Sequence, residues 1–305
     1  MFQVRSLFSG CHGQAQRRPC FPEPGTACAA LDRGTRNRGA PLFRTFVIVF
    51  ACLCIASFDS QTFGRDQDQQ TPEPRAKVDA KRILIITGED YKGHKWKLTT
   101  PVLKRHIEKD KRLSVEVVDK LTFLRSKKLH DYDAVVMHFK NYDPKVPGRE
   151  GYDNLNKFVE RGGGLVLVHF CCGAFQEFKG DYVKLVGRIW DRKRRGHDPY
   201  GTFTVNITKE KHPITRGMAS FKTTDELYTC LTGDTPITVL AAGVSKIDKK
   251  THPLAFVVTS KEHRVFHCVL GHDVKALSNE GTGKLFRRGT AWTAKLKLTD
   301  KGVQP

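Results

Sequence analysis

The sequence lacks the cysteine pattern of a disulfide-bonded or zinc-binding scaffold. It holds nine cysteines among 305 residues and no Cys-x-x-Cys pair. Five of the nine precede residue 57, and the four that follow are Cys171, Cys172, Cys230 and Cys268. A disulfide framework would show regularly spaced cysteines, and a structural zinc site would show closely spaced ligands. We therefore predict no disulfide framework and assign no residue as a metal ligand, although the residue types that gather at the predicted site would also suit a metal ion. The residues point to no particular cofactor.

Long hydrophobic runs are also missing. The longest, residues 46–56, is too short to cross a bilayer comfortably but suits the core of a signal peptide. We expect residues 1–56 to be an N-terminal extension carrying a signal peptide cleaved after Ala56, and the protein to be exported, periplasmic or envelope-associated. The stretch before the run is long for a signal peptide, which suggests a start downstream of Met1. The alternative is a short membrane anchor retained in the mature protein.

Residues 57–80 are polar, contain Pro72 and Pro74 and show no apolar period. Such a composition cannot bury enough apolar surface to fold, so a disordered linker is expected. The folded domain is predicted to cover residues 81–297, followed by a tail at 298–305. No internal repeat is visible, which favours one elaborated domain over two.

The folded part is strongly basic. Residues 81–305 hold 42 lysines and arginines against 25 aspartates and glutamates, a net charge of +17. A surplus of this size attracts anionic partners in general. The densest cluster, residues 192–195, lacks the interleaved aromatics of a base-stacking surface, so a solvated loop is expected and no specific nucleic-acid partner. Any contact with a membrane is expected only through the N-terminal segment. The sequence leaves open whether the protein forms a homo-oligomer.

The apolar pattern predicts alternating strands and helices. Strands are expected at residues 82–87, 114–119, 134–137, 202–208, 237–242, 254–258 and 264–270, and helices at 98–109, 152–161, 175–186 and 283–295. The first half therefore predicts an α/β fold with a doubly wound, mainly parallel, flavodoxin-like sheet. The second half is richer in strands, which we expect to extend this sheet.

Residues 162–173 form the most informative segment. An apolar run between glycines predicts a strand buried on both faces, and His169, Cys171 and Cys172 stand at its exit. In open α/β sheets ligands bind outside the carboxyl ends of the strands. The segment thus predicts a site at this edge.

Histidines follow several of the predicted strands. His94 comes after the first, His138 after the third, His169 after the fourth, and His272 with Asp273 after the last long one. If the sheet forms as predicted, these groups share one edge with Glu89 and Cys172, where they could move protons. The segments His197-Asp198 and Thr224–Tyr228, which contains Glu226, could reach the same edge. The alternative is that several of these histidines are hydrogen-bonded core or turn residues.

Cys172 has two interpretations. A cysteine at a strand-to-helix turn lies near a helix N-terminus, which lowers the pKa of a thiol and favours a nucleophile. Equally, a buried cysteine can be a small hydrophobic residue of the core. Cys171 is expected to pack inward.

Taken together, these segments resemble the ThuA-like (trehalose utilisation) family, whose fold is similar to class I glutamine amidotransferases. The matching residues are 88–96, 162–173, 185–188, 196–199, 212–215, 225–228, 252–253, 264–267 and 270–273. The resemblance implies a role in the uptake and breakdown of disaccharides, including oxidised sugars. The family generally lacks the Cys-His-Glu set of amidotransferases. Here Cys172 stands at the turn but His272-Asp273 replaces the expected His-x-Glu, so glutamine hydrolysis is not expected.

The predicted function is binding of, or action on, a carbohydrate-derived substrate, either as an acid/base hydrolase or isomerase or as a non-catalytic sugar-binding module. The predicted catalytic residues are His169, Cys172, Glu226, His272 and Asp273. The predicted substrate-binding residues are Glu89, His94, Trp96, His197 and Asp198. Trp96, Trp190 and Tyr200 are the aromatic side chains expected to stack on a sugar.

Overall fold

The computed structural model describes residues 80–91, 93–259 and 263–298. The predicted N-terminal extension, nearly all of the linker and nearly all of the tail lie outside the described residues. Within the described ranges, no helix combines the length and apolar character needed to cross a membrane.

One half of the main sheet is parallel. Its strands lie side by side in the order β2 (Leu113–Val118), β1 (Lys81–Ile86), β3 (Ala134–Met137), β4 (Gly164–Val168) and β11 (Arg264–Cys268). Strands β1, β3 and β4 are almost wholly apolar because both faces of the sheet are covered. The order 2-1-3-4-5 is that of flavodoxin-like folds. The predicted mainly parallel core is therefore confirmed.

The other half is antiparallel and comes from the second part of the chain. It continues from β11 through β10 (Thr251–Thr259), β9 (Thr238–Val244), β6 (Gly201–Ile207) and β7 (Phe221–Asp225). These are the extra strands expected from the sequence. A separate pair is formed by β5 (Ile189–Trp190) and β8 (Leu231–Thr232).

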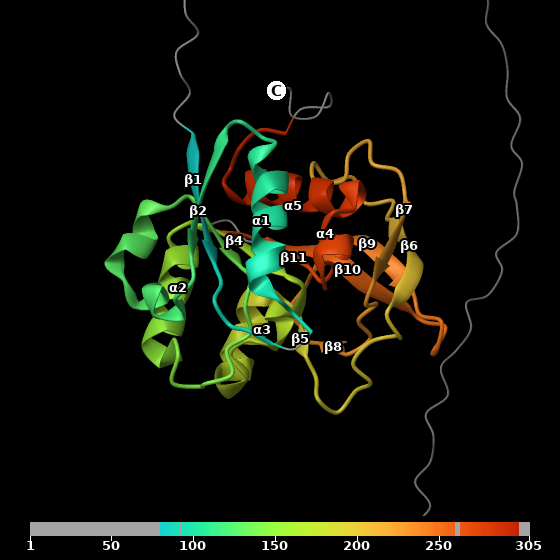
Figure 1. Ribbon diagram of the computed structural model, residues 1–305, viewed down its shortest axis with the longest axis horizontal. Coiled ribbons are helices and arrows are strands. Elements are labelled where there is room, and N and C mark those ends of the chain that lie inside the picture. Colours follow the sequence, from blue (N-terminus) through green and yellow to red (C-terminus); the bar gives the residue numbers. More distant parts are fainter. Residues whose placement is uncertain (1–79, 92, 260–262, 299–305) are drawn as a thin grey trace, which may run out of the picture. The chain divides into compact units, whose positions relative to one another are not determined.

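Helices cover both faces of the sheet. Figure 1 shows α1 (Trp96–Glu108), α4 (Val274–Leu277) and α5 (Glu280–Thr293) grouped over the middle of the sheet, where they contact one another. The remaining helices, α2 (Gly148–Glu160) and α3 (Lys179–Val186), pack on the opposite face. Four short 3-10 turns complete the described elements, at Leu121–Arg125, Lys127–Asp131, His169–Gly173 and Gln176–Phe178.

The two cores follow from strand alternation. Ile83 and Ile85 of β1 join the core under α1 and α5, whereas Leu84 and Ile86 join the core under α2 and α3. Successive side chains of a strand point to opposite faces, so one apolar strand supplies both layers. This double burial holds the carboxyl ends of the parallel strands at a common edge.

Candidate functional site

A pocket of about 390 Å³ opens at the carboxyl edge of the parallel strands. It is built by the loops that follow β1, β3, β4 and β11. Strand β5, the loop after it and the segment between β7 and β8 complete it. The lining residues are Tyr91, Gly93, His94, Lys140, Tyr142, Phe170, Gly173, Trp190, His197, Glu226, Tyr228 and His272. This is the edge at which the sequence predicted a site.

Glu226 lies at the centre of a ring of imidazoles. Its Oε2 is 3.2 Å from Nδ1 of His272 and 3.5 Å from Nε2 of His169. Its Oε1 is 3.4 Å from Nε2 of His197. Three of the predicted site residues, far apart in the sequence, are therefore brought within contact of the carboxylate of a fourth.

His169 is held in a strained position at the exit of β4. Its φ is 49°, in the left-handed region that non-glycine residues rarely adopt, and such strain gathers at functional sites. The ring is fully buried, with Nδ1 2.8 Å from the carbonyl oxygen of Val269 and Nε2 3.0 Å from the hydroxyl of Tyr228. The carbonyl can only accept, so Nδ1 donates to it. Nε2 is directed toward Tyr228 and Glu226, and the buried ring itself does not line the pocket.

His94 completes the cluster from the loop after β1. Its ring lies against Phe170, and its centroid is 5.0 Å from that of His169 and 4.8 Å from that of His272. The side chain is nearly fully buried, yet neither ring nitrogen has a hydrogen-bond partner among the described residues. Burial, together with the neighbouring imidazoles, lowers the pKa of His94 to about 2, so the ring is neutral.

Asp225 organises the backbone beneath this cluster. The fully buried carboxylate accepts hydrogen bonds from the backbone N–H groups of Glu226, Gly271 and His272. It therefore ties the end of β7 to the loop after β11 and sets the spacing between Glu226 and His272. Burial raises the pKa of Asp225 despite these bonds. The sequence analysis did not select Asp225, although it directly precedes Glu226.

The charges of Glu226 and His272 stabilise each other. Burial alone would raise the pKa of Glu226, but the adjacent imidazoles of His169 and His272 outweigh burial and bring it well below its usual range. Burial alone would lower the pKa of His272, and the nearby carboxylate of Glu226 raises it instead. The polar end of the pocket thus combines an ionised carboxylate with an imidazole that holds its proton more firmly than usual.

Aromatic side chains line the pocket beside this cluster, where Tyr91 stacks on His94 with ring centroids 5.3 Å apart. The rings of Tyr91 and Tyr142 stack with centroids 5.4 Å apart, and the ammonium group of Lys140 lies 5.1 Å from the centre of the Tyr142 ring. Trp190 packs edge-on against Tyr228 at 5.1 Å. Of the three aromatics predicted to stack on a sugar, Trp190 is the one that lines the pocket.

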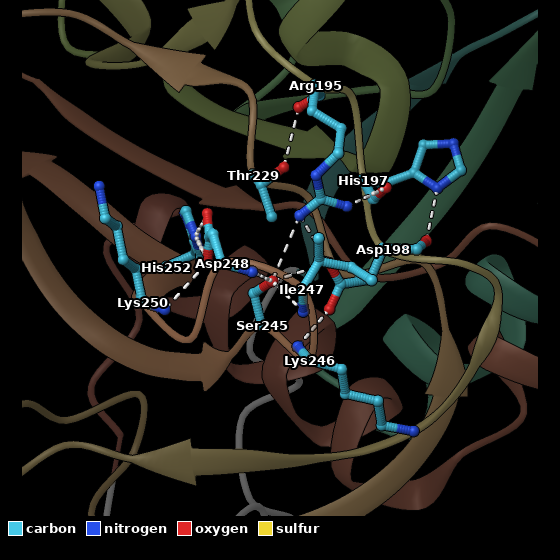
Figure 2. A network of polar contacts seen from close by, with 10 residues as sticks. All are labelled: Arg195, His197, Asp198, Thr229, Ser245, Lys246, Ile247, Asp248, Lys250 and His252. Carbon is cyan, nitrogen blue, oxygen red and sulfur yellow. Dashed lines mark hydrogen bonds and ion pairs between the residues drawn. The ribbon is translucent and has the colours of Figure 1, made fainter.

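The loop that carries His197 is anchored by a polar network (Figure 2). Asp198 is buried and accepts hydrogen bonds from the Arg195 guanidinium, the Ser245 hydroxyl and the backbone N–H of Lys246. Arg195 also donates to the carbonyl oxygen of His197. Asp198 therefore lies outside the pocket lining and holds the loop in place, which argues against the direct substrate contact predicted for it.

Cys172 lies in the hydrophobic core and not on the pocket surface. Its side chain is fully buried, and burial raises the pKa of the thiol well above its usual value. The turn after β4 is a short 3-10 helix, and the dipole effect expected there does not outweigh desolvation. The structure therefore argues against the nucleophile predicted at Cys172.

Three other predicted residues lie outside the pocket lining. Asp273 caps α4 by accepting from the backbone N–H of Ala276 and also accepts from the hydroxyl of Tyr200, whose ring lies beside His272. Against the effect of burial, its charge also adds to those of Glu226 and Asp225 in raising the pKa of His272. Glu89 and Trp96 are half-buried beside the pocket without lining it.

The fold and the site define a class of protein. A parallel core of order 2-1-3-4-5 with its pocket at the carboxyl edge, extended by antiparallel strands, is a flavodoxin-like α/β fold, as the sequence predicted. The chain belongs to the ThuA family, since the family model described as trehalose utilisation matches residues 82–293.

Solved structures agree on the fold. A ThuA-like protein from Parabacteroides merdae is 23% identical, with a TM-score of 0.62 over 72% of this chain and 92% of that chain. A ThuA-like protein from Bacteroides uniformis is 16% identical, with a TM-score of 0.57 over 73% and 94%. A protein from Salmonella typhimurium, described as cytoplasmic, is 14% identical, with a TM-score of 0.52 over 70% and 99%. A comparison with curated proteins gives no match.

Proposed function

We propose that this pocket binds a carbohydrate-derived substrate, such as an oxidised disaccharide, and that the cluster around Glu226 performs acid–base chemistry on it. The observation that carries the proposal is the division of one pocket into an aromatic wall and a polar end where imidazoles surround a carboxylate. The family's description, trehalose utilisation, supports the choice of substrate class.

The pocket suits a sugar in size and lining. Small-molecule sites usually enclose roughly 300–1,000 Å³, with apolar and aromatic walls and a few convergent polar groups. Here Tyr91, Tyr142 and Trp190 supply flat apolar faces, and Lys140 supplies a donor for sugar oxygens. A ring stacked against these aromatics would present its hydroxyl or carbonyl groups to Glu226.

The proton chemistry would centre on three residues. His272 holds its proton beside Glu226 and can act as an acid toward a leaving or enolising oxygen. His197 lies across the same carboxylate with a half-exposed side chain, so it can exchange protons with solvent. General acid–base catalysis of this kind contributes about 10²–10⁴-fold to a rate.

The test is a panel of trehalose, sucrose and their keto derivatives, with binding measured by calorimetry and turnover by chromatography. Trp190→Ala should weaken binding by about tenfold. Glu226→Gln should lower turnover by about 100-fold or more. The matched control is Glu160→Gln, which changes an exposed carboxylate on α2 that accepts a hydrogen bond from the side-chain amide of Asn156.

Two results would count against the proposal in different ways. Binding that depends on Trp190, without turnover of any sugar, would establish the alternative of a non-catalytic sugar-binding module. Absence of binding across the panel would overturn the carbohydrate substrate itself.

A further inference from the structure

We propose that His94, His169, Glu226 and His272 bind one divalent transition-metal cation at the polar end of the pocket. Each residue offers one ligand atom, and the four atoms all lie within 4.8 Å of one another. They come from four separate segments of the chain, so local sequence geometry does not account for the convergence.

The first argument is the direction of the His169 lone pair. Because Nδ1 donates to the carbonyl oxygen of Val269, Nε2 presents a lone pair toward Glu226 Oε2 at 3.5 Å. A cation placed between Nε2 and Oε2 would contact both atoms. Metal-bound histidines commonly donate their other ring N–H to a carbonyl or carboxylate, as His169 does here.

The hydroxyl of Tyr228 is the competing partner for that lone pair, at 3.0 Å from Nε2. A hydroxyl can rotate its proton toward another acceptor, so Tyr228 need not block a cation. The competition gives a separate expectation, namely that Tyr228→Phe keeps the metal site.

The second argument is His94. Its side chain is 8% exposed, and both ring nitrogens lack a hydrogen-bond partner among the described residues. A buried polar group without a partner is costly, typically about 1–3 kcal/mol, so native structures rarely retain one without a reason. Coordination of a cation would satisfy this ring.

His272 shows the same incomplete pairing. Its Nδ1 is 3.2 Å from Glu226 Oε2, yet the two atoms are not aligned as a hydrogen bond. Two ligands of a tetrahedral cation with bonds of about 2.0–2.1 Å stand roughly 3.3–3.5 Å apart. The separations of 3.2 and 3.5 Å around Glu226 Oε2 are close to that geometry. The widest pair of ligand atoms, which lie within 4.8 Å of each other, would need to close by about 1.3–1.5 Å.

The donor set indicates the kind of cation. Three imidazoles and one carboxylate favour Zn²⁺, Co²⁺, Ni²⁺ or Fe²⁺, whereas Mg²⁺ and Ca²⁺ prefer oxygen ligands throughout. The inference rests on the proposed function and revises one role in it. With a cation bound, His272 would be a ligand and not the acid, the cation would polarise a substrate oxygen, and proton transfer would pass to His197. Its test nevertheless needs no substrate.

The experiment uses the full chain, stripped with a chelator and titrated with Zn²⁺ and Co²⁺ while metal content and calorimetry are recorded. We expect one high-affinity ion per chain, with Co²⁺ giving the visible absorption of a tetrahedral site. His94→Phe and Glu226→Gln should each weaken Zn²⁺ binding by more than about 100-fold, and Tyr228→Phe should not. The matched control is His130→Gln, which alters a histidine paired with Asn154 at the opposite edge of the sheet.

A stability measurement separates metal loss from misfolding. The side chain of His94 makes no hydrogen bond within the described residues, so metal-free His94→Phe should melt at or above the temperature of the metal-free parent. The upward shift of melting temperature caused by Zn²⁺ should disappear in this variant.

Zn²⁺ binding that is absent in the parent, or unchanged in both His94→Phe and Glu226→Gln, would overturn the metal site. That result would leave the carbohydrate proposal standing if sugars still bind. Conversely, a metal site without sugar binding would overturn only the proposed function.

Discussion

At the residue scale, the site depends on side chains whose orientation or backbone is held by a hydrogen bond to a neighbouring structural residue. Val269 fixes the ring of His169, and Asp225 fixes the backbone of Glu226 and His272. The functional atoms of these side chains are then left facing the pocket. A substitution at the fixing partner should therefore act on function through geometry.

Asp225→Asn tests this positioning role. The amide replaces one acceptor oxygen with a donor that faces backbone N–H groups, so we expect the free energy of unfolding to fall by about 2 kcal/mol. Zn²⁺ affinity should fall as well, because the spacing between Glu226 and His272 is no longer held. Asp248→Asn is the control, since Asp248 also accepts from a backbone N–H and a histidine but lies in the network of Figure 2 away from the pocket. Equal Zn²⁺ affinity in the Asp225 variant and the parent would refute the role.

Cys172 gives a second prediction at this scale. Because the thiol is fully buried and its pKa is raised, iodoacetamide at neutral pH should leave Cys172 unmodified in the folded protein and modify it in denaturant. Peptide mass spectrometry assigns the label to Cys172 among the other cysteines. Fast labelling of Cys172 in the native state, accompanied by loss of turnover, would support the nucleophilic role predicted for it from the sequence.

At the element scale, the packing of α5 on the sheet depends on close approach. A Cβ built on Gly289 would overlap the ring of Phe266 on β11, whereas a Cβ on Gly180 of α3 meets no atom within 4 Å. Gly289→Ala should lower the free energy of unfolding by about 1–3 kcal/mol despite its better helix propensity. Gly180→Ala should raise it by about 0.5 kcal/mol. Chemical denaturation of the pair measures both, and a neutral Gly289→Ala would contradict the packing seen here.

The buried histidine of β11 predicts loss of stability in acid. His267 is fully buried and donates toward the carbonyl oxygen of Val186, and burial lowers its pKa from 6.5 to about 4. Between pH 6.5 and about 4, His267 binds a proton in the unfolded state but not in the folded state. The free energy of unfolding therefore has its full value above pH 6.5 and falls as the pH drops from 6.5 to about 4. The loss amounts to about 3 kcal/mol.

His267→Phe checks this prediction. The variant should be less stable at neutral pH, because Val186 loses its donor, but its free energy of unfolding should depend less on pH between 6.5 and 4. Urea denaturation at several pH values compares the slopes. Identical slopes in parent and variant would show that other groups cause the acid sensitivity.

At the scale of the whole molecule, the basic surplus is partly neutralised where it is densest. Within the 192–195 cluster, Arg194 pairs with Asp191 at 3.4 Å and Arg195 with Asp198 at 2.8 Å. Two of the four basic side chains are therefore paired with carboxylates. Arg195 also takes part in the polar network that anchors the loop. This arrangement supports the solvated loop expected from the sequence.

The N-terminal segment yields a prediction of its own, because residues 1–79 lie outside the described part of the chain. If residues 46–56 are a signal-peptide core, the protein recovered from its native cells should begin after Ala56, as read by N-terminal sequencing and intact mass. Val49→Arg should block this processing, since a charge disrupts the apolar core. An uncleaved parent found in the membrane fraction would support the retained anchor instead.

The sequence by itself determined the layered fold. Alternating strands and helices with apolar strands buried on both faces permit few arrangements, and the predicted strands at residues 82–87, 134–137 and 264–270 appear within a few residues of their expected bounds. It did not show β7, whose Phe-Lys-Thr-Thr-Asp stretch is too polar to be recognised without its partner β6. The helix predicted at 152–161 begins earlier, at Gly148, because its first turn has little apolar pattern.

The tertiary structure alone decided which of the candidate residues share the site. Sequence placed His169, His272 and Cys172 at strand ends with equal weight, but the turn after β4 directs His169 toward Glu226 and Cys172 into the core. The structural roles of Asp225 and Tyr228 follow from the contacts that β7 and the loop after it make with Gly271 and His169. The physical reason is that strand periodicity fixes an edge of the sheet, whereas the direction of each side chain beyond that edge depends on loop conformation and on contacts between residues far apart in the chain.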